Sequence, residues 1–302
     1  MKPKIMMISM KSNLRIVRYI GLLLMFIFCL TAQNMMAQRG KLFNSDNQLS
    51  SNLATQVFQD SNGFIWIATR NGLNIYDGYN FTVIRKAYDN SDGLNSNYIN
   101  CITQDEKGRI VLGTNKSLLI FKGKRFSNVP MLDSKDKPIS TYVTQVSRLH
   151  NGDIAVATSG YGIMTKKIDA NASYAMKGEV EKLKFVHKIL EDKQERLWII
   201  LENGKLYRKE KNGKLVSRIM GTEQLNTQDI RQDDKGNIYL ATKNDGVYLL
   251  KAGSTVFTKI AGIGNLPIGN IYISRDQRLF IGCDGMGIFV YNPVTGFLQN
   301  NP

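Results

Sequence analysis

One motif recurs about six times along this 302-residue chain, at intervals of 41 to 45 residues. Three copies read QDSNGFIWIAT from Gln59, QDEKGRIVLGT from Gln104 and QDDKGNIYLAT from Gln232, and weaker copies follow residues 151, 192 and 276. The position that the glycine takes falls at 63, 108, 152, 195, 236 and 277, with Glu at 195 and Gln at 277. A nearly constant period of this length indicates one supersecondary unit repeated along the chain.

Each unit is predicted to contain four short strands. The Asp-x-x-Gly segment is typical of a turn, because the Asp side chain accepts hydrogen bonds from the turn backbone and Gly adopts a positive φ. Apolar, β-branched and aromatic runs stand on both sides of this turn and are separated by further Gly, Asn and Asp residues. Four strands in about 40–45 residues is the size of one propeller blade. We therefore expect an all-β protein, a β-propeller of about six four-stranded antiparallel blades. The alternative is a β-solenoid, whose coils are usually shorter.

The same segments resemble a known repeat family. The stretch from Gly63 to Phe81, the stretch from Leu94 to Ile99 and the pair Gln104-Asp105 are similar to the two-component regulator propeller repeat. The similarity extends over about residues 42–298. The resemblance implies the periplasmic sensor region of a hybrid two-component system histidine kinase of Bacteroidetes. It also implies a glycan or oligosaccharide ligand, signalling to a kinase module, and relatives that are anchored in the inner membrane. A second copy of the chain, in a homodimer, is a further expected partner.

The amino terminus has the pattern of a secretory signal peptide. Residues 1–18 hold five basic residues and no acidic one, an apolar run follows from Tyr19 to Leu30, and small residues come next. We expect export to the periplasm, with a signal peptide at residues 1–37 and the propeller domain at residues 38–302. Cleavage is predicted after Ala37, or alternatively after Ala32. The other interpretation is a retained membrane anchor. Removing residues 1–37 lowers the formal charge from +15 to +10.

Little in the sequence supports catalysis. Of the two histidines, His150 is predicted to take the turn position where other repeats have Asp, and His187 lies in a strand; both are interpreted as structural. No Cys/His spacing fits a metal, and no nucleophile or phosphate-binding motif occurs. We therefore predict no catalytic residue, no metal and no cofactor. The basic residues form no block with interleaved aromatics, so no bound nucleic acid is expected.

Residues that recur in every unit are interpreted as architecture. The repeated carboxylates are expected to cap turns, because a turn is needed in every blade and a catalytic group only once. Trp66 and Trp198 share one position and are expected to pack between blades. Cys101 and Cys283 are predicted to be buried free thiols, since a bridge between them would have to cross the ring.

Ligand recognition is predicted where the repeats differ. The loops that join the second and third strands of the blades share one face, and binding residues concentrate on such loops. These loops carry cations, amides and an aromatic residue, which suit sugar hydroxyls and carboxylates or sulfates. The candidate ligand-binding residues are Arg70, Lys116, Tyr161 and Lys243.

The ring is expected to be incomplete. Six blades and one further strand at Leu42-Phe43 leave a seven-bladed ring unfinished, so we expect a fragment, a truncated product or a six-bladed propeller. Two sheet faces would then be exposed, an aggregation liability. Contact with a membrane is expected only through missing downstream segments or a retained amino-terminal signal. Two further function classes stay open: a propeller enzyme that acts on polysaccharide as a lyase or hydrolase, and a protein-interaction platform.

Overall fold

A computed structural model of the chain describes residues 42–87, 93–123 and 125–301. The predicted signal peptide, residues 1–37, lies outside the described residues. The described segments contain no helix with the length and apolar character needed to cross a bilayer.

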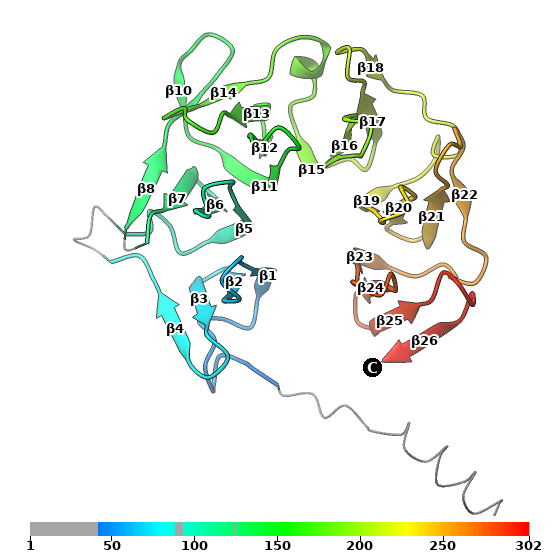
Figure 1. Ribbon diagram of the computed structural model, residues 1–302, viewed down its shortest axis with the longest axis horizontal. Coiled ribbons are helices and arrows are strands. Elements are labelled where there is room, and N and C mark those ends of the chain that lie inside the picture. Colours follow the sequence, from blue (N-terminus) through cyan, green and yellow to red (C-terminus); the bar gives the residue numbers. More distant parts are fainter. Residues whose placement is uncertain (1–41, 88–92, 124, 302) are drawn as a thin grey trace, which may run out of the picture. The chain divides into compact units, whose positions relative to one another are not determined.

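The described residues form six antiparallel blades, which follow one another in chain order around a common axis (Figure 1). The predicted all-β propeller is therefore confirmed. Blade 1 contains β1 (Ala54–Gln59), β2 (Ile65–Thr69), β3 (Gly72–Tyr76) and β4 (Phe81–Ile84), and blade 2 contains β5 (Ile99–Gln104), β6 (Ile110–Thr114), β7 (Leu118–Phe121) and β8 (Phe126–Val129). Blade 3 contains β11 (Tyr142–Arg148), β12 (Ile154–Ser159), β13 (Gly162–Lys166) and β14 (Ser173–Ala175).

The later blades have the same order. Blade 4 contains β15 (Val186–Glu191), β16 (Leu197–Leu201), β17 (Leu206–Lys209) and β18 (Leu215–Val216), and blade 5 contains β19 (Thr227–Gln232), β20 (Ile238–Thr242), β21 (Val247–Leu250) and β22 (Thr258–Lys259). Blade 6 contains β23 (Ile268–Ile273), β24 (Leu279–Cys283), β25 (Gly287–Tyr291) and β26 (Leu298–Asn301). The sheet of blade 3 is wider than predicted, because the hairpin β9 (Met131–Leu132) and β10 (Pro138–Ile139) pairs with β14. A short 3-10 helix, η1 (Glu179–Lys182), precedes blade 4.

The recurring carboxylate makes the turn between the first and second strands of a blade. In blade 1, Asp60 Oδ1 accepts the N–H groups of Asn62 and Phe64 at 2.9 and 3.0 Å, and its Oδ2 accepts the indole N–H of Trp66 at 2.8 Å. Blade 4 repeats the indole bond from Trp198 to Asp192 at 2.7 Å. These bonds satisfy polar groups that the packed blades bury. The structural interpretation of the repeated carboxylates and indoles is therefore confirmed.

Two blades keep the turn without its glycine. Glu195 and Gln277 take the glycine position at φ values of 59° and 63°, where Gly63 has 89°. The turn itself therefore requires the left-handed conformation, which Glu195 and Gln277 adopt at the steric cost that a Cβ atom brings.

The turn of blade 3 corrects one prediction. Leu149, and not His150, takes the position of the turn carboxylate, because the N–H of Gly152 bonds to the carbonyl of Leu149. His150 is the next residue, and its Nδ1 lies 3.1 Å from a carboxylate oxygen of Glu191.

The apolar core of the described residues consists of five clusters, each between two consecutive blades. Trp66 lies between blades 1 and 2, and Trp198, with 0% of its surface exposed, lies between blades 4 and 5. Successive side chains of a strand point to opposite faces of the blade, and each face packs against one neighbouring blade. A side chain is therefore buried only where a neighbouring blade covers its face.

Blades 1 and 6 lack such a neighbour on one face, and none of the clusters found among the described residues joins them. Ile102 of blade 2 is 1% exposed, whereas Val57, at the same position of blade 1, is 62% exposed. Tyr272 and Ile288 of blade 6 are 62% and 48% exposed. Figure 1 shows the two blades facing each other without shared strands. The expected closing strand at Leu42-Phe43 is not found, since residues 42–53 form no strand.

Candidate functional site

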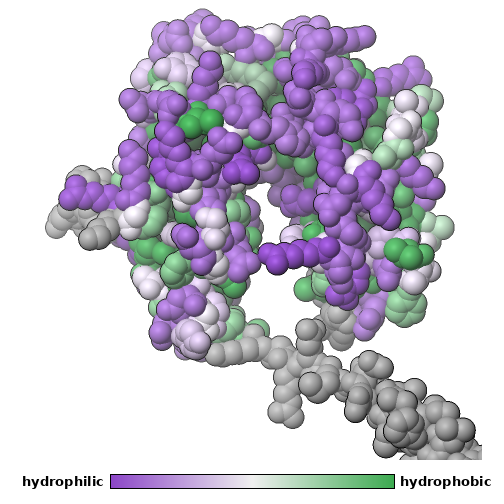
Figure 2. All heavy atoms as spheres, viewed as in Figure 1, coloured by the Kyte–Doolittle hydropathy of each residue, from purple (hydrophilic) through white to green (hydrophobic). Residues whose placement is uncertain are grey.

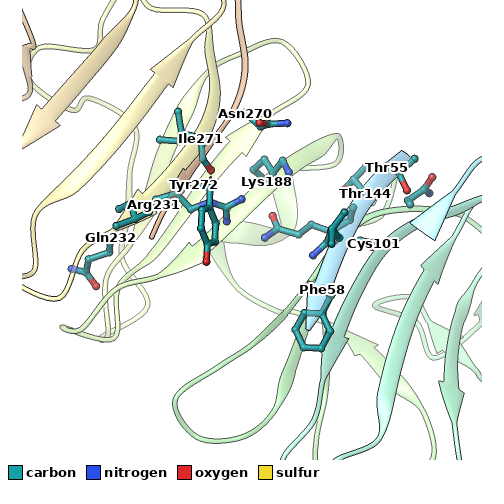
Figure 3. A pocket seen from close by; sticks show the side chains of 15 residues that line it. Thr55, Phe58, Cys101, Thr144, Lys188, Arg231, Gln232, Asn270, Ile271 and Tyr272 are labelled. Atoms are coloured by element: carbon teal, nitrogen blue, oxygen red, sulfur yellow. Dashed lines mark hydrogen bonds between the residues drawn. The ribbon is translucent and has the colours of Figure 1, made fainter. Parts of the chain in front are cut away.

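The first strands of all six blades surround an axial cavity of about 570 Å³. Figure 2 shows an opening at the centre of the propeller, and hydrophilic residues cover much of the face around it. Figure 3 shows Arg231 and Tyr272 on one side of the cavity and Thr55 and Phe58 on the opposite side, with Lys188 between them. Most lining side chains carry a hydrogen-bonding group; the lining comprises Thr55, Gln56, Val57, Phe58, Asn100, Cys101, Thr144, Gln145, Lys188, Arg231, Gln232, Asn270, Ile271, Tyr272 and Ile273.

A β-bulge near the start of each first strand positions these side chains. The pairing with the second strand skips one residue in every blade, and the skipped residues are Thr55, Asn100, Thr144, His187, Gln228 and Gly269. Thr55 Oγ1 donates to the carbonyl of Ile99 in the next blade at 2.6 Å. Thr144 Oγ1 bonds Val186 in the same way, also at 2.6 Å. The bulge therefore turns a side chain toward the neighbouring first strand and fixes the spacing of the strands.

The two cations of the cavity differ in their partners. Arg231 donates Nε–H to the carbonyl of Ile271 at 3.0 Å and lies 3.2 Å from Oδ2 of the buried Asp229, so its charge is compensated. Lys188 forms no ion pair with any described residue. A partly buried ammonium group without a carboxylate partner favours an anionic group on a bound molecule.

Asn100 also has an unused group. Its Nδ2 donates to the carbonyl of Val143 at 2.8 Å. Its Oδ1 is buried without a hydrogen-bond partner among the described residues. A buried acceptor of this kind is normally satisfied by a donor such as a water or a ligand hydroxyl.

The four predicted binding residues lie in equivalent loops. Arg70, Lys116, Tyr161 and Lys243 are all exposed and lie between the second and third strands of blades 1, 2, 3 and 5. Their side chains make no hydrogen bond, ion pair or ring contact with one another in the described part of the chain. The loops therefore place these residues on one face without bringing them into a single cluster.

Arg70 belongs to a group that the sequence analysis did not name. Its guanidinium carbon lies 5.4 Å from the ring centroid of Tyr98, and that ring packs edge-on against Tyr142 at 5.9 Å. The two tyrosine hydroxyls are 3.4 Å apart. Burial, followed by the hydroxyl of Tyr98, raises the pKa of Tyr142 above its usual 10, so the Tyr142 hydroxyl stays protonated at neutral pH.

Burial shifts the pKa values of the two thiols and of one histidine in the described part of the chain. Cys101 and Cys283 are free and buried, as predicted, and burial raises the pKa of the Cys101 thiol to about 12, which disfavours a thiolate. Burial lowers the pKa of His187, with Lys188 contributing to the same direction. No group of three or more metal-ligating side chains occurs in the described ranges.

A family model described as two component regulator propeller matches residues 48–71 and 93–116. Each match covers the first strand, the Asp-x-x-Gly turn and the second strand of a blade, in blades 1 and 2. The chain therefore carries two component regulator propeller repeats, as its sequence predicts. The sequence matches no curated protein.

Solved structures share the propeller fold. The extracellular domain of a putative hybrid two component system from B. thetaiotaomicron is 22% identical at a TM-score of 0.73, with 86% of this chain and 36% of that chain covered. A second extracellular domain from B. thetaiotaomicron, of a putative one component system, is 15% identical at a TM-score of 0.67, with 83% and 36% covered. Virginiamycin B lyase from Staphylococcus aureus is 14% identical at a TM-score of 0.66, with 87% of both chains covered. The chain spans about a third of the length of the two extracellular domains.

Proposed function

We propose that this chain is the exported ligand-sensing propeller of a hybrid two-component regulator, and that it binds an oligosaccharide and signals to a kinase module. The family match and the two extracellular domains of similar fold support the sensor class. The observation that carries the ligand proposal is the axial cavity, whose lining combines hydrogen-bonding side chains with the uncompensated ammonium group of Lys188. Sugar hydroxyls match the former, and a uronic acid carboxylate matches the latter.

A saccharide panel tests the proposal. We expect one of cellohexaose, xylohexaose, mannohexaose and hexagalacturonate to raise the melting temperature, because a ligand that binds only the folded chain stabilises it. The acidic hexagalacturonate is expected to bind best. Lys188→Met should weaken its binding by about 10-fold. Lys214→Met, at an exposed site on the outer part of blade 4, is the matched control.

The rim residues have a secondary role in this proposal. Arg70, Lys116, Tyr161 and Lys243 hold the part of the saccharide that extends beyond the cavity, and each Ala substitution should weaken binding several-fold. A panel in which no saccharide stabilises the chain would overturn the ligand proposal. Cleavage of any panel member would show that this chain is an enzyme, as virginiamycin B lyase is.

Export and assembly are part of the same proposal. The sensor acts in the periplasm after removal of residues 1–37 and signals as a homodimer. N-terminal sequencing of the chain recovered from a periplasmic fraction should begin at Gln38. Recovery only with the membrane fraction and an intact amino terminus would contradict this part.

A further inference from the structure

Three consecutive blades carry an aromatic residue at one equivalent position. Tyr98, Tyr142 and Phe185 each lie two residues before the bulge of the first strand in blades 2, 3 and 4. The other blades have Leu53, Asn226 and Pro267 there. We call Tyr98, Tyr142 and Phe185 the aromatic arc.

Hydrogen bonds fix the positions of the arc residues at the starts of neighbouring first strands. The carbonyls of Tyr98 and Phe185 accept the N–H groups of Asn115 and Glu202, the first residues after β6 and β16. Asn100 joins β5 to Val143 of β11, and Thr144 joins β11 to Val186 of β15. Figure 1 shows β5, β11 and β15 as consecutive inner strands. The arc therefore follows the entrance to the axial cavity, on the face that carries the loops between the second and third strands.

Packing of the core does not explain these aromatic side chains. None of the three belongs to the apolar clusters found among the described residues. Tyr142 is 38% exposed and Phe185 is 57% exposed. Exposed aromatic surface at a cavity entrance is unfavourable in water, and a bound molecule that covers it would remove this cost.

The surroundings of the arc define the chemistry of that molecule. Arg70 stacks on Tyr98 at one end and forms no ion pair with the described residues. Asn115, Lys184 and Glu202 adjoin the arc, so aromatic side chains and hydrogen-bonding groups occur together in this part of the described surface. A pyranose ring is complementary to this surface, because it has an apolar C–H face and a rim of hydroxyls. An amphipathic peptide would require a continuous apolar groove.

We propose that the aromatic arc is a saccharide-stacking subsite, on which pyranose rings pack against Tyr142 and Phe185 while Arg70, oriented by Tyr98, binds a hydroxyl or carboxylate at one end. The inference rests on the proposed function, because it names the surface outside the axial cavity that the oligosaccharide occupies. It assigns length selectivity to the arc: a hexasaccharide reaches both the cavity and the arc, whereas a disaccharide does not.

The test measures dissociation constants by calorimetry for the panel member that binds best, and for the disaccharide of the same sugar. Tyr142→Ala and Phe185→Ala should each weaken hexasaccharide binding by about 10-fold and leave disaccharide binding nearly unchanged. Tyr142→Phe and Phe185→Tyr retain the flat ring and should bind within about 3-fold of the natural chain. Tyr174→Ala is the matched control, since Tyr174 is 47% exposed on β14 and outside the arc.

The outcomes separate the two proposals. Unchanged hexasaccharide affinity in both Ala variants overturns the arc and leaves the cavity proposal intact. A natural chain that binds no saccharide overturns both, and binding of members of a random decapeptide library in their place assigns the arc to a peptide. Circular dichroism checks the fold of the variants, and Phe185→Ala, at the most exposed of the three sites, keeps the test valid if Tyr142→Ala does not fold.

Discussion

Gln145 of β11 bonds the backbone of Ile189 on β15 twice. Its Oε1 accepts the N–H of Ile189 at 2.7 Å, and its Nε2 donates to the carbonyl of the same residue at 3.1 Å. Gln56 bonds Ile102 of the next blade in the same way, with both distances at 3.0 Å. The first strands have no strand partner toward the axis, so these amides satisfy backbone groups that would otherwise stay unpaired.

Replacing Gln145 should destabilise the propeller. Gln145→Leu leaves both backbone groups of Ile189 without their partner, and we expect the free energy of unfolding to fall by about 1–3 kcal/mol. Urea denaturation followed by tryptophan fluorescence measures it. Gln299→Leu, at an exposed position of blade 6, is the control and should change little. Equal stability of the two variants would show that water replaces the amide.

The carboxylate of Asp192 is expected to contribute more to the stability of the folded chain than a turn residue usually does. It is 0% exposed and accepts bonds from the indole of Trp198 and from Nε of Arg196, both at 2.7 Å. Asp192→Ala leaves the buried indole N–H unpaired, which costs about 1–3 kcal/mol for that donor alone. Asp276→Ala, at a more exposed ion pair of blade 6, should cost less than about 1 kcal/mol. Thermal and urea unfolding of the two variants decide the point, and comparable losses would contradict it.

The open faces of blades 1 and 6 should cause self-association. Tyr272 and Ile288 present apolar surface on one of these faces. Sedimentation velocity is expected to show larger species as protein concentration rises, and the double substitution Tyr272→Lys with Ile288→Lys should reduce them. Tyr79→Lys alters an 86% exposed tyrosine at the turn before β4 and is the control. Monomeric behaviour of the natural chain at all concentrations would mean that the faces are covered in solution.

His187 should make stability depend on pH below 6.5. Burial first, and Lys188 second, lower its pKa in the folded chain, whereas Asp229 and Glu202 oppose the shift. The unfolded chain therefore binds a proton at higher pH than the folded chain. Stability decreases as pH falls from 6.5 toward the lowered pKa, by at most about 1.4 kcal/mol per pH unit. His187→Gln should flatten this slope in melting curves recorded between pH 5 and 8. An unchanged slope would assign the pH dependence to other groups.

The sites that sequence analysis missed had a signal in the sequence. Tyr98, Tyr142 and Phe185 each lie ten residues before the glycine position of their repeat, at 108, 152 and 195. An aromatic residue at the start of a strand is ordinary on its own, because β-strands favour such residues. Only the exposure of the side chains and their exclusion from the core clusters distinguish them from packing residues.

The sequence by itself determined the blade. A carboxylate and a residue of positive φ fix a local turn, and strand alternation fixes which residues can be buried, so Asp60, Trp66 and their counterparts were assignable without coordinates. The tertiary structure decided what lies around the axis and between blades: the contact of Gln145 with Ile189, the pairing of Asp229 with Arg231 of the cavity lining, and the exposed faces of blades 1 and 6. Gln145 and Ile189 lie 44 positions apart, and the geometry of their contact depends on how each bulge orients its strand toward the next blade, which a local pattern does not encode.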